Sequence, residues 1–244
     1  MKHLLLSLGL LCLGAGSARA QTTAPPAAAP RPNACPPAPA NTTPAQAHEN
    51  ERQRWNNLLT DSTWRATRFN TQPNTLLVET VMGRKPGTAL DVGMGEGRNG
   101  IYLARQGWQV TGIDIADKAL ALAQKQAQTA GVQLNTVVAD AETYDWGTAK
   151  WDLIVLSYAG GREYADQVKK ALRPGGLVVL EGFHSDAAKG RKIGNGVVFE
   201  TDELKKLYAA AGLTIVRYQE PMGVADFSKE NLRLVQLVAQ KPRK

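Results

Sequence analysis

The stretch Ala89-Leu90-Asp91-Val92-Gly93-Met94-Gly95-Glu96-Gly97-Arg98-Asn99-Gly100 joins an apolar run to an acid and a glycine-rich turn. The run from Thr88 to Val92 is typical of a strand, and the residues after the turn have the apolar spacing of a helix. A turn of this kind brings bare backbone N–H groups up to a nucleotide-like ligand. Glycine is needed because a side chain would block the approach and because the turn favours positive φ. The stretch predicts a nucleoside-binding α/β domain.

Two further acids follow predicted strands in the same way. The run 109–113 ends in Asp114, about 20 residues beyond the turn, where a carboxylate can accept hydrogen bonds from ribose hydroxyls. Asp140 follows the run 132–138. Taken singly, each acid also has a structural interpretation, since Asp91 would cap the turn and Asp140 would cap the next segment. Their joint placement favours a ligand site, because ligands bind at the carboxyl ends of parallel strands.

Strand-like and helical segments alternate along most of the chain. Further strands are predicted at 151–156 and 177–180, and further helices at 116–130, 164–172 and 202–211. Thr201 is the predicted N-cap of the last helix. The runs 213–218 and 232–240 have only a loop between them, so they should pair antiparallel. The pattern predicts an α/β fold with a mostly parallel sheet, an antiparallel last strand and helices on both faces.

The segment 45–70 has helical spacing of its large apolar residues. It has two interpretations, a helix that packs on the edge of the sheet or a lid over the ligand.

Composition changes sharply within the first 44 residues. A basic start, an apolar run over 4–16 and Ala18-Arg19-Ala20 predict a signal peptide over residues 1–20, with cleavage after Ala20. An uncleaved anchor is the alternative, although the apolar run is short for a membrane span. Residues 21–44 hold eight of the 13 prolines and predict a disordered Pro/Ala-rich linker. Residues 45–244 are expected to form one domain, without a transmembrane span.

Charge and metal-ligating residues exclude several classes of function. The formal net charge of +7 is spread along the chain without an aromatic-interleaved basic stripe, so a solvated surface is favoured over a nucleic-acid footprint. Cys35 would be the one cysteine left after cleavage, and it lies in the predicted linker. His48 and His184 are isolated in the sequence. We therefore expect no metal site.

The chain resembles the class I S-adenosylmethionine-dependent methyltransferases over roughly residues 70–240. Within that class it is most similar to small-molecule members with a Gly-Arg-Asn turn, such as the tellurite-resistance methyltransferases. The resemblance rests on the segment 90–99, Asp114, Asp140, Leu172-Arg173-Pro174-Gly175-Gly176 and the C-terminal antiparallel pair. It implies a Rossmann-like sheet of seven strands in the order 3-2-1-4-5-7-6. It also implies S-adenosylmethionine as cofactor, a small-molecule acceptor and no nucleic-acid partner.

The resemblance assigns the methionine end of the cofactor to the glycine-rich turn. Asp91 would hold it together with the backbone of three glycines, Gly93, Gly95 and Gly97. Met94 departs from the cysteine that is frequent at this position in related sequences. Because that side chain takes no part in the chemistry, we expect the departure to have no effect.

The resemblance assigns the nucleoside end to the next two strand ends. Asp114 would bind the ribose hydroxyls and Ile115 would pack on the adenine. Asp140 would accept a hydrogen bond from the adenine amino group, with the N–H of Ala141 nearby. Leu156, at the end of the fourth strand, would border the sulfonium.

Two side chains are candidates for removing a proton from the acceptor. Tyr158 follows the fourth predicted strand and His184 follows the fifth, so both are expected at the active edge of the sheet. The alternative for each is substrate packing or a surface turn. Ser157-Tyr158-Ala159-Gly160 stands where methyltransferases of adenine or glutamine amino groups carry Asn/Asp-Pro-Pro-Tyr. This departure favours a small-molecule substrate.

Two other functions compete with methyl transfer. A nicotinamide enzyme would use Gly95 to Gly100 as G-x-G-x-x-G, but that register puts Gly93 inside the strand and leaves Asp91 unexplained. It also lacks a Tyr-x-x-x-Lys pair, since Arg162 stands at that spacing from Tyr158. The other alternative is an exported nucleoside- or S-adenosylmethionine-binding protein without transferase activity. The predicted export favours this alternative, because the cofactor is made in the cytoplasm and an exported enzyme would lack an obvious supply of it.

Export to the periplasm is a testable prediction of the first 20 residues. We expect a reporter fused after residue 44 to appear in the periplasmic fraction with residues 1–20 removed. A matched fusion that lacks residues 2–20 should stay in the cytoplasm. A cytoplasmic full-length product that still begins at Met1 would contradict the prediction.

Overall fold

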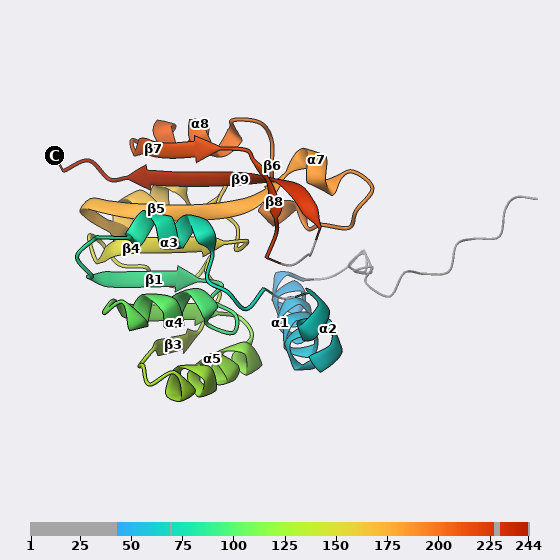
Figure 1. Ribbon diagram of the computed structural model, residues 1–244. Helices are drawn as coiled ribbons and strands as arrows, with labels where there is room; N and C mark the ends of the chain where they lie inside the picture. Colours follow the sequence, from blue (N-terminus) through green and yellow to red (C-terminus); the bar gives the residue numbers. More distant parts are fainter. Residues whose placement is uncertain (1–42, 69, 227–229, 244) are drawn as a thin grey trace, which may run out of the picture. The chain divides into compact units, whose positions relative to one another are not determined.

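The structure is a computed structural model that describes residues 43–68, 70–226 and 230–243 (Figure 1). The predicted signal peptide lies outside the described residues, as does the predicted linker except for Thr43 and Pro44. Among the helices of the described ranges, none has the length and apolarity that crossing a membrane requires.

A central sheet carries the fold. Its strands are β1 (Thr88–Val92), β2 (Gln109–Asp114), β3 (Asn135–Val138), β4 (Trp151–Ser157), β5 (Leu172–His184), β6 (Val198–Phe199), β7 (Thr214–Gln219), β8 (Met222–Val224) and β9 (Asn231–Gln240). The main path runs β3-β2-β1-β4-β5-β9-β7. Strands β1 to β5 pair in parallel, whereas β9 is antiparallel to both β5 and β7. When β6 and β8 are left out of the numbering, this path has the predicted order 3-2-1-4-5-7-6 with its antiparallel last strand, but the sheet has nine strands where seven were predicted. The short strands β6 and β8, which pair with β5 and β9, were not predicted.

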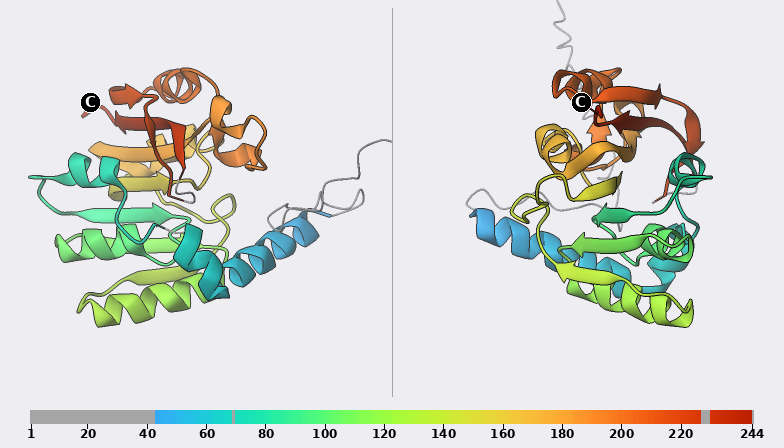
Figure 2. Two further views of the ribbon diagram at one scale, coloured as in Figure 1. Left: turned by 45° about the vertical axis from the view of Figure 1, so that its right-hand side comes forward. Right: turned by 90° about the vertical axis from the view of Figure 1, so that its left-hand side faces the viewer.

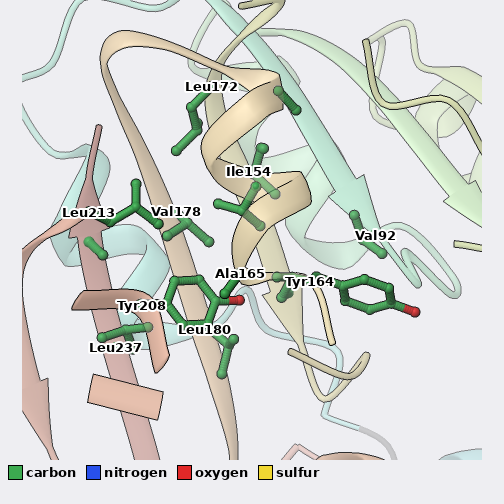
Figure 3. Close-up of a cluster of buried hydrophobic side chains, with 14 of the residues drawn as sticks. Val92, Ile154, Tyr164, Ala165, Leu172, Val178, Leu180, Tyr208, Leu213 and Leu237 are labelled. Carbon is green, nitrogen blue, oxygen red and sulfur yellow. The ribbon is translucent and has the colours of Figure 1, made fainter. Parts of the chain in front are cut away.

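Helices cover both faces of the sheet, as predicted (Figure 2). They are α1 (Pro44–Thr60), α2 (Ser62–Arg68), α3 (Thr75–Val81), α4 (Arg98–Arg105), α5 (Asp117–Thr129), α6 (Ala165–Ala171), α7 (Ser185–Ala188) and α8 (Glu203–Ala210). Successive strand residues point to opposite faces. Val92, Ile154 and Val178 therefore pack with α6 and α8 (Figure 3), while Leu153 and Val155 pack with α3, α4 and α5.

Strand β5 is longer than the predicted 177–180. Trp151 of β4 pairs with Leu172 and Leu153 pairs with Leu177, so residues 173–176 form a bulge between the two pairs. Gly175 takes a φ of 83° in this bulge. Beyond it, β5 continues to His184 because β9 pairs with it from the other side over residues 177–183.

The predicted N-cap of helix α8 is wrong. The cap residue is Asp202, with a φ of 59°, and its side chain makes no capping hydrogen bond. The Thr201 hydroxyl is engaged elsewhere, 3.0 Å from Nε2 of His184. A contact between two distant segments thus displaces a local capping preference.

Helix α1 begins one residue before the predicted start of the domain. Thr43 is its N-cap and forms a capping box with Gln46, and Pro44 occupies the first turn, where its missing N–H costs nothing. Figure 1 shows α1 and α2 beside the end of the sheet toward which β1 and β4 point. This end is where the candidate site lies.

Candidate functional site

A cavity of about 460 Å³ opens at the carboxyl ends of β1, β2 and β4. This volume lies within the ~300–1,000 Å³ of ordinary small-molecule sites. The predicted cofactor residues that line it are Gly93, Gly95, Asp114, Ile115, Asp140 and Ala141. Segments that lie far apart in the sequence therefore meet around one cavity, at the place where open α/β sheets bind ligands.

Three predicted cofactor residues do not line the cavity: Asp91, Gly97 and Leu156. Asp91 and Leu156 are buried within their strands. Gly97 is the N-cap of α4, where a Cβ atom would lie 2.9 Å from Cβ of Ala123. These three residues pack beneath the residues that line the cavity.

Asp114 is bound to the glycine-rich turn. Its Oδ2 accepts a hydrogen bond of 2.8 Å from the N–H of Gly95, and its Oδ1 accepts one of 2.8 Å from the N–H of Ala116. Burial raises the pKa of the Asp114 carboxyl. The carboxylate therefore fixes the turn while it faces the cavity, and each oxygen retains a lone pair for a hydroxyl donor.

The turn itself presents bare backbone to the cavity. Gly95 has a φ of 54°, and a Cβ atom built on it would have no neighbour within 4 Å. Gly93 has a φ of 62°, and its Cβ atom would lie 2.6 Å from Cβ of Ala159. Both positions therefore require glycine.

Met94 has a packing role. Its side chain is buried over β2, where a Cβ atom on Gly112 would lie 1.8 Å from Sδ of Met94. The side chain fills the space above that glycine, away from the cavity.

Asp91 is a buried carboxylate with an unused acceptor. Its residue is 1% exposed, and Oδ2 has no hydrogen-bond partner within the described ranges. Burial raises its pKa to about 7, although Arg98 acts in the opposite direction. Burying an acceptor without a donor is unfavourable. A cationic N–H donor bound at the turn would supply what this carboxylate lacks.

Asp140 is engaged by two segments. Its Oδ1 accepts a hydrogen bond of 2.9 Å from the N–H of Glu142, and its Oδ2 pairs with Nδ1 of His48 on α1. His48 also lines the cavity. In the sequence His48 is an isolated histidine, because nothing local shows that α1 reaches the end of β3.

Tyr158 borders the cavity at the end of β4. It has a φ of 56°, an uncommon backbone conformation for a bulky residue that is often found at functional sites. Its hydroxyl donates a hydrogen bond of 2.9 Å to Oε1 of Glu181.

Glu181 was missed by the sequence analysis. It is 4% exposed and also accepts hydrogen bonds from Asn74 (2.8 Å) and Gln236 (2.6 Å). Burial raises the pKa of the Glu181 carboxyl. Glu181 directly follows the predicted strand 177–180, so the pattern that identified Asp114 and Asp140 could have found it.

His184, the other catalytic candidate, does not line the cavity. It is 3% exposed, and its Nδ1 accepts a hydrogen bond of 3.1 Å from the N–H of Asp186, which caps α7. Of the two candidates, Tyr158 alone lies at the cavity. Among the described residues no group of three or more histidines, cysteines or acids is placed to hold a metal ion.

Comparison with known proteins finds a family match for part of the chain. Residues 89–176 match the family model described as a methyltransferase domain. The chain is 31% identical to demethylmenaquinone methyltransferase of Thermus thermophilus over 43% of this chain and 51% of the relative. It is 34% identical to ribosomal RNA small subunit methyltransferase G of Burkholderia cenocepacia over 45% of this chain and 52% of the relative. The chain thus spans about half the length of these curated relatives.

A solved structure extends the similarity to most of the fold. The 1,6-didemethyltoxoflavin-N1-methyltransferase of Burkholderia thailandensis, with bound 1,6-didemethyltoxoflavin and S-adenosylhomocysteine, superimposes with a TM-score of 0.52 and 22% identity. The superposition covers 81% of this chain and 85% of that protein. Residues 89–176 therefore match a methyltransferase domain, and the chain around them shares the fold of this solved enzyme.

Proposed function

We propose that this protein transfers a methyl group from S-adenosylmethionine to a small-molecule acceptor. The observation that carries the proposal is the convergence of Gly93, Gly95, Asp114 and Asp140 on one cavity at the carboxyl ends of three parallel strands. The matched methyltransferase domain spans all four residues.

The cavity offers a complementary group to each part of the cofactor. The Oδ2 of Asp91, which lies behind the lining without a hydrogen-bond partner among the described residues, is an acceptor for a methionine ammonium, and the open space at Gly95 leaves room for the methionine chain. Asp114 fits the ribose hydroxyls, because its oxygens face the cavity with acceptor capacity left. Ile115 and Asp140 fit the apolar face and the amino edge of adenine. In this arrangement Gly97 and Leu156 shape the site through packing, without touching the cofactor.

In methyl transfer the protein itself forms no covalent bond to the substrate. The cofactor supplies an electrophilic methyl group on a sulfonium. The residues of the chain have to hold the acceptor in line, exclude water and hold a leaving proton. Tyr158, which follows β4 and lines the cavity, and Glu181 within β5, which accepts the hydrogen bond of its hydroxyl, are the groups placed for the last task.

A small-molecule acceptor is supported by the solved relative, which holds 1,6-didemethyltoxoflavin. The charges of the described part also favour it, because much of the positive charge is paired with acids. The arginines with ion pairs include Arg52, Arg98, Arg162, Arg173, Arg217 and Arg233. Paired arginines are poorly available to phosphates. One of the relatives is a ribosomal RNA methyltransferase, so RNA is the alternative acceptor that an experiment has to exclude.

Replacing Asp114 tests the cofactor site. We expect Asp114→Ala in the full chain to weaken S-adenosylmethionine binding by roughly 10- to 100-fold, because a charge-assisted hydrogen bond contributes about 1.5–3 kcal/mol. Isothermal titration calorimetry measures the change. Asp166→Ala, an exposed acid on α6, is the matched control and should bind as the unchanged chain does. Equal affinity for Asp114→Ala would contradict the assignment.

Proton release on binding tests the role of Asp91. Since its pKa is raised to about 7 from the ordinary 3.8, the carboxyl is mostly protonated at pH 6 in the free protein. A methionine ammonium beside it favours the charged form and lowers the pKa. Binding of S-adenosylmethionine at pH 6 should therefore release close to one proton. Calorimetry in two buffers of different ionisation enthalpy measures this number.

The matched variant for this measurement is Asp91→Asn, which keeps the shape and removes the titrating group. We expect it to bind without the release at pH 6. The same proton count in both proteins would show that Asp91 does not face the ammonium.

The acceptor class can be tested without knowing the acceptor. We expect the chain, incubated with cell extract and methyl-labelled S-adenosylmethionine, to place the label in the low-molecular-weight fraction, and Asp114→Ala to lower that signal. Label in ribosomal RNA would contradict a small-molecule acceptor. Tight cofactor binding without label in any fraction would favour the binding protein without transferase activity.

A further inference from the structure

Helix α1 contributes one wall of the cavity. Its lining residues are Ala47, His48, Glu51, Trp55 and Leu59. Four of them follow one another at intervals of four residues, so they lie along one face of the helix. None of them belongs to the segment 89–176 that matches the methyltransferase domain. This wall is therefore a feature of the chain outside that domain.

Helix α1 packs against the start of α5, beside the predicted nucleoside end of the site. Asn56 Nδ2 donates a hydrogen bond of 2.8 Å to Asp117 Oδ1, at the first turn of α5. Leu59, 4% exposed, packs with Ala116 and Ala119, which are fully buried. Ala116 follows Asp114 and Ile115 directly, so α1 is held close to the residues that fit ribose and adenine.

Trp55 presents a fixed aromatic surface in this wall. Its Nε1 donates a hydrogen bond of 2.7 Å to Oε1 of Glu51, so the polar edge of the indole is satisfied. The guanidinium of Arg54 lies 5.2 Å from the ring centroid. The ring is half-buried against the cluster formed by Leu59, Ala116 and Ala119. A flat apolar surface that lines a cavity together with Ile115 is suited to the face of a nucleobase.

His48 contacts Asp140, the acid that fits the adenine amino group. Its Nδ1 pairs with Oδ2 of Asp140, while the N–H of Glu142 uses Oδ1 at 2.9 Å. Both carboxylate oxygens are thus engaged by the chain. An incoming amino group that approaches Oδ2 has to share this oxygen with His48 or displace His48 from it.

We propose that α1 is a functional part of the cofactor site, in which Trp55 stacks on the adenine and His48 competes with the adenine amino group for Asp140. The proposal rests on the proposed function, because it takes the cavity to be the cofactor site. It assigns opposite effects to two residues of one helix. Loss of Trp55 weakens binding, whereas loss of His48 strengthens it. A helix with a merely structural role would lose affinity in both variants.

Calorimetric titration of the full chain with S-adenosylhomocysteine tests the two effects. Trp55→Ala should bind roughly 5- to 100-fold more weakly, the range expected for one stacked base. Trp55→Phe keeps an aromatic face and should recover most of the affinity. His48→Ala should bind about 1.5- to 5-fold more tightly, as expected for removing a partly exposed ion pair that opposes binding.

Two controls separate the proposal from loss of structure and from the proposed function. Gln53→Ala changes an exposed residue of α1 that does not line the cavity, and it should bind as the unchanged chain does. Normal affinity of Trp55→Ala, or weaker binding by His48→Ala, would overturn the role of α1 while the cofactor site stands. Failure of the unchanged chain to bind S-adenosylhomocysteine would instead overturn the proposed function, and the role of α1 with it.

Discussion

The hydrogen bond from the N–H of Gly95 to the Asp114 carboxylate, 2.8 Å long, joins the ends of the first two strands. It holds the glycine-rich turn after β1 in a position where its backbone faces the cavity. The same carboxylate binds the N–H of Ala116 and so positions the start of α5, on which α1 rests. One half-buried acid therefore connects the turn, the sheet edge and the helical wall of the site. This dependence explains why burial of Asp114 is tolerated although it raises the pKa.

The two faces of the sheet place different demands on β1. Leu90 and Val92 join the hydrophobic core with α6 and α8. Asp91 points to the opposite face, beneath α4, and carries a buried oxygen that has no donor among the described residues. A sequence that favoured stability alone would place an apolar residue there. The unfavourable burial of the Asp91 oxygen thus occurs at the position where a cationic part of the cofactor would supply the missing hydrogen-bond donor.

A second buried polar group lies at the other side of the cavity. Glu181 receives hydrogen bonds from Asn74, Tyr158 and Gln236, which lie 107, 23 and 55 residues away along the chain. Burial and the nearby charge of Asp226 raise the pKa of this carboxyl, and the three hydrogen bonds oppose that rise. The arrangement fixes the Tyr158 hydroxyl at the end of β4. It gives the acceptor side of the cavity a rigid polar point among apolar residues.

The amino-acid sequence by itself determined the parts of the protein that depend on short-range chemistry. The strand 88–92, the glycine turn and the acids at the strand ends were recognisable because apolar runs and glycines impose their conformation locally. Tertiary structure decided the length of β5, which needs β9 beside it, and the pairing of His48 with Asp140. It also decided that Tyr158, and not His184, reaches the cavity. These features depend on contacts between segments far apart in the chain. A local sequence pattern cannot predict them, because it does not specify which distant side chain packs against it.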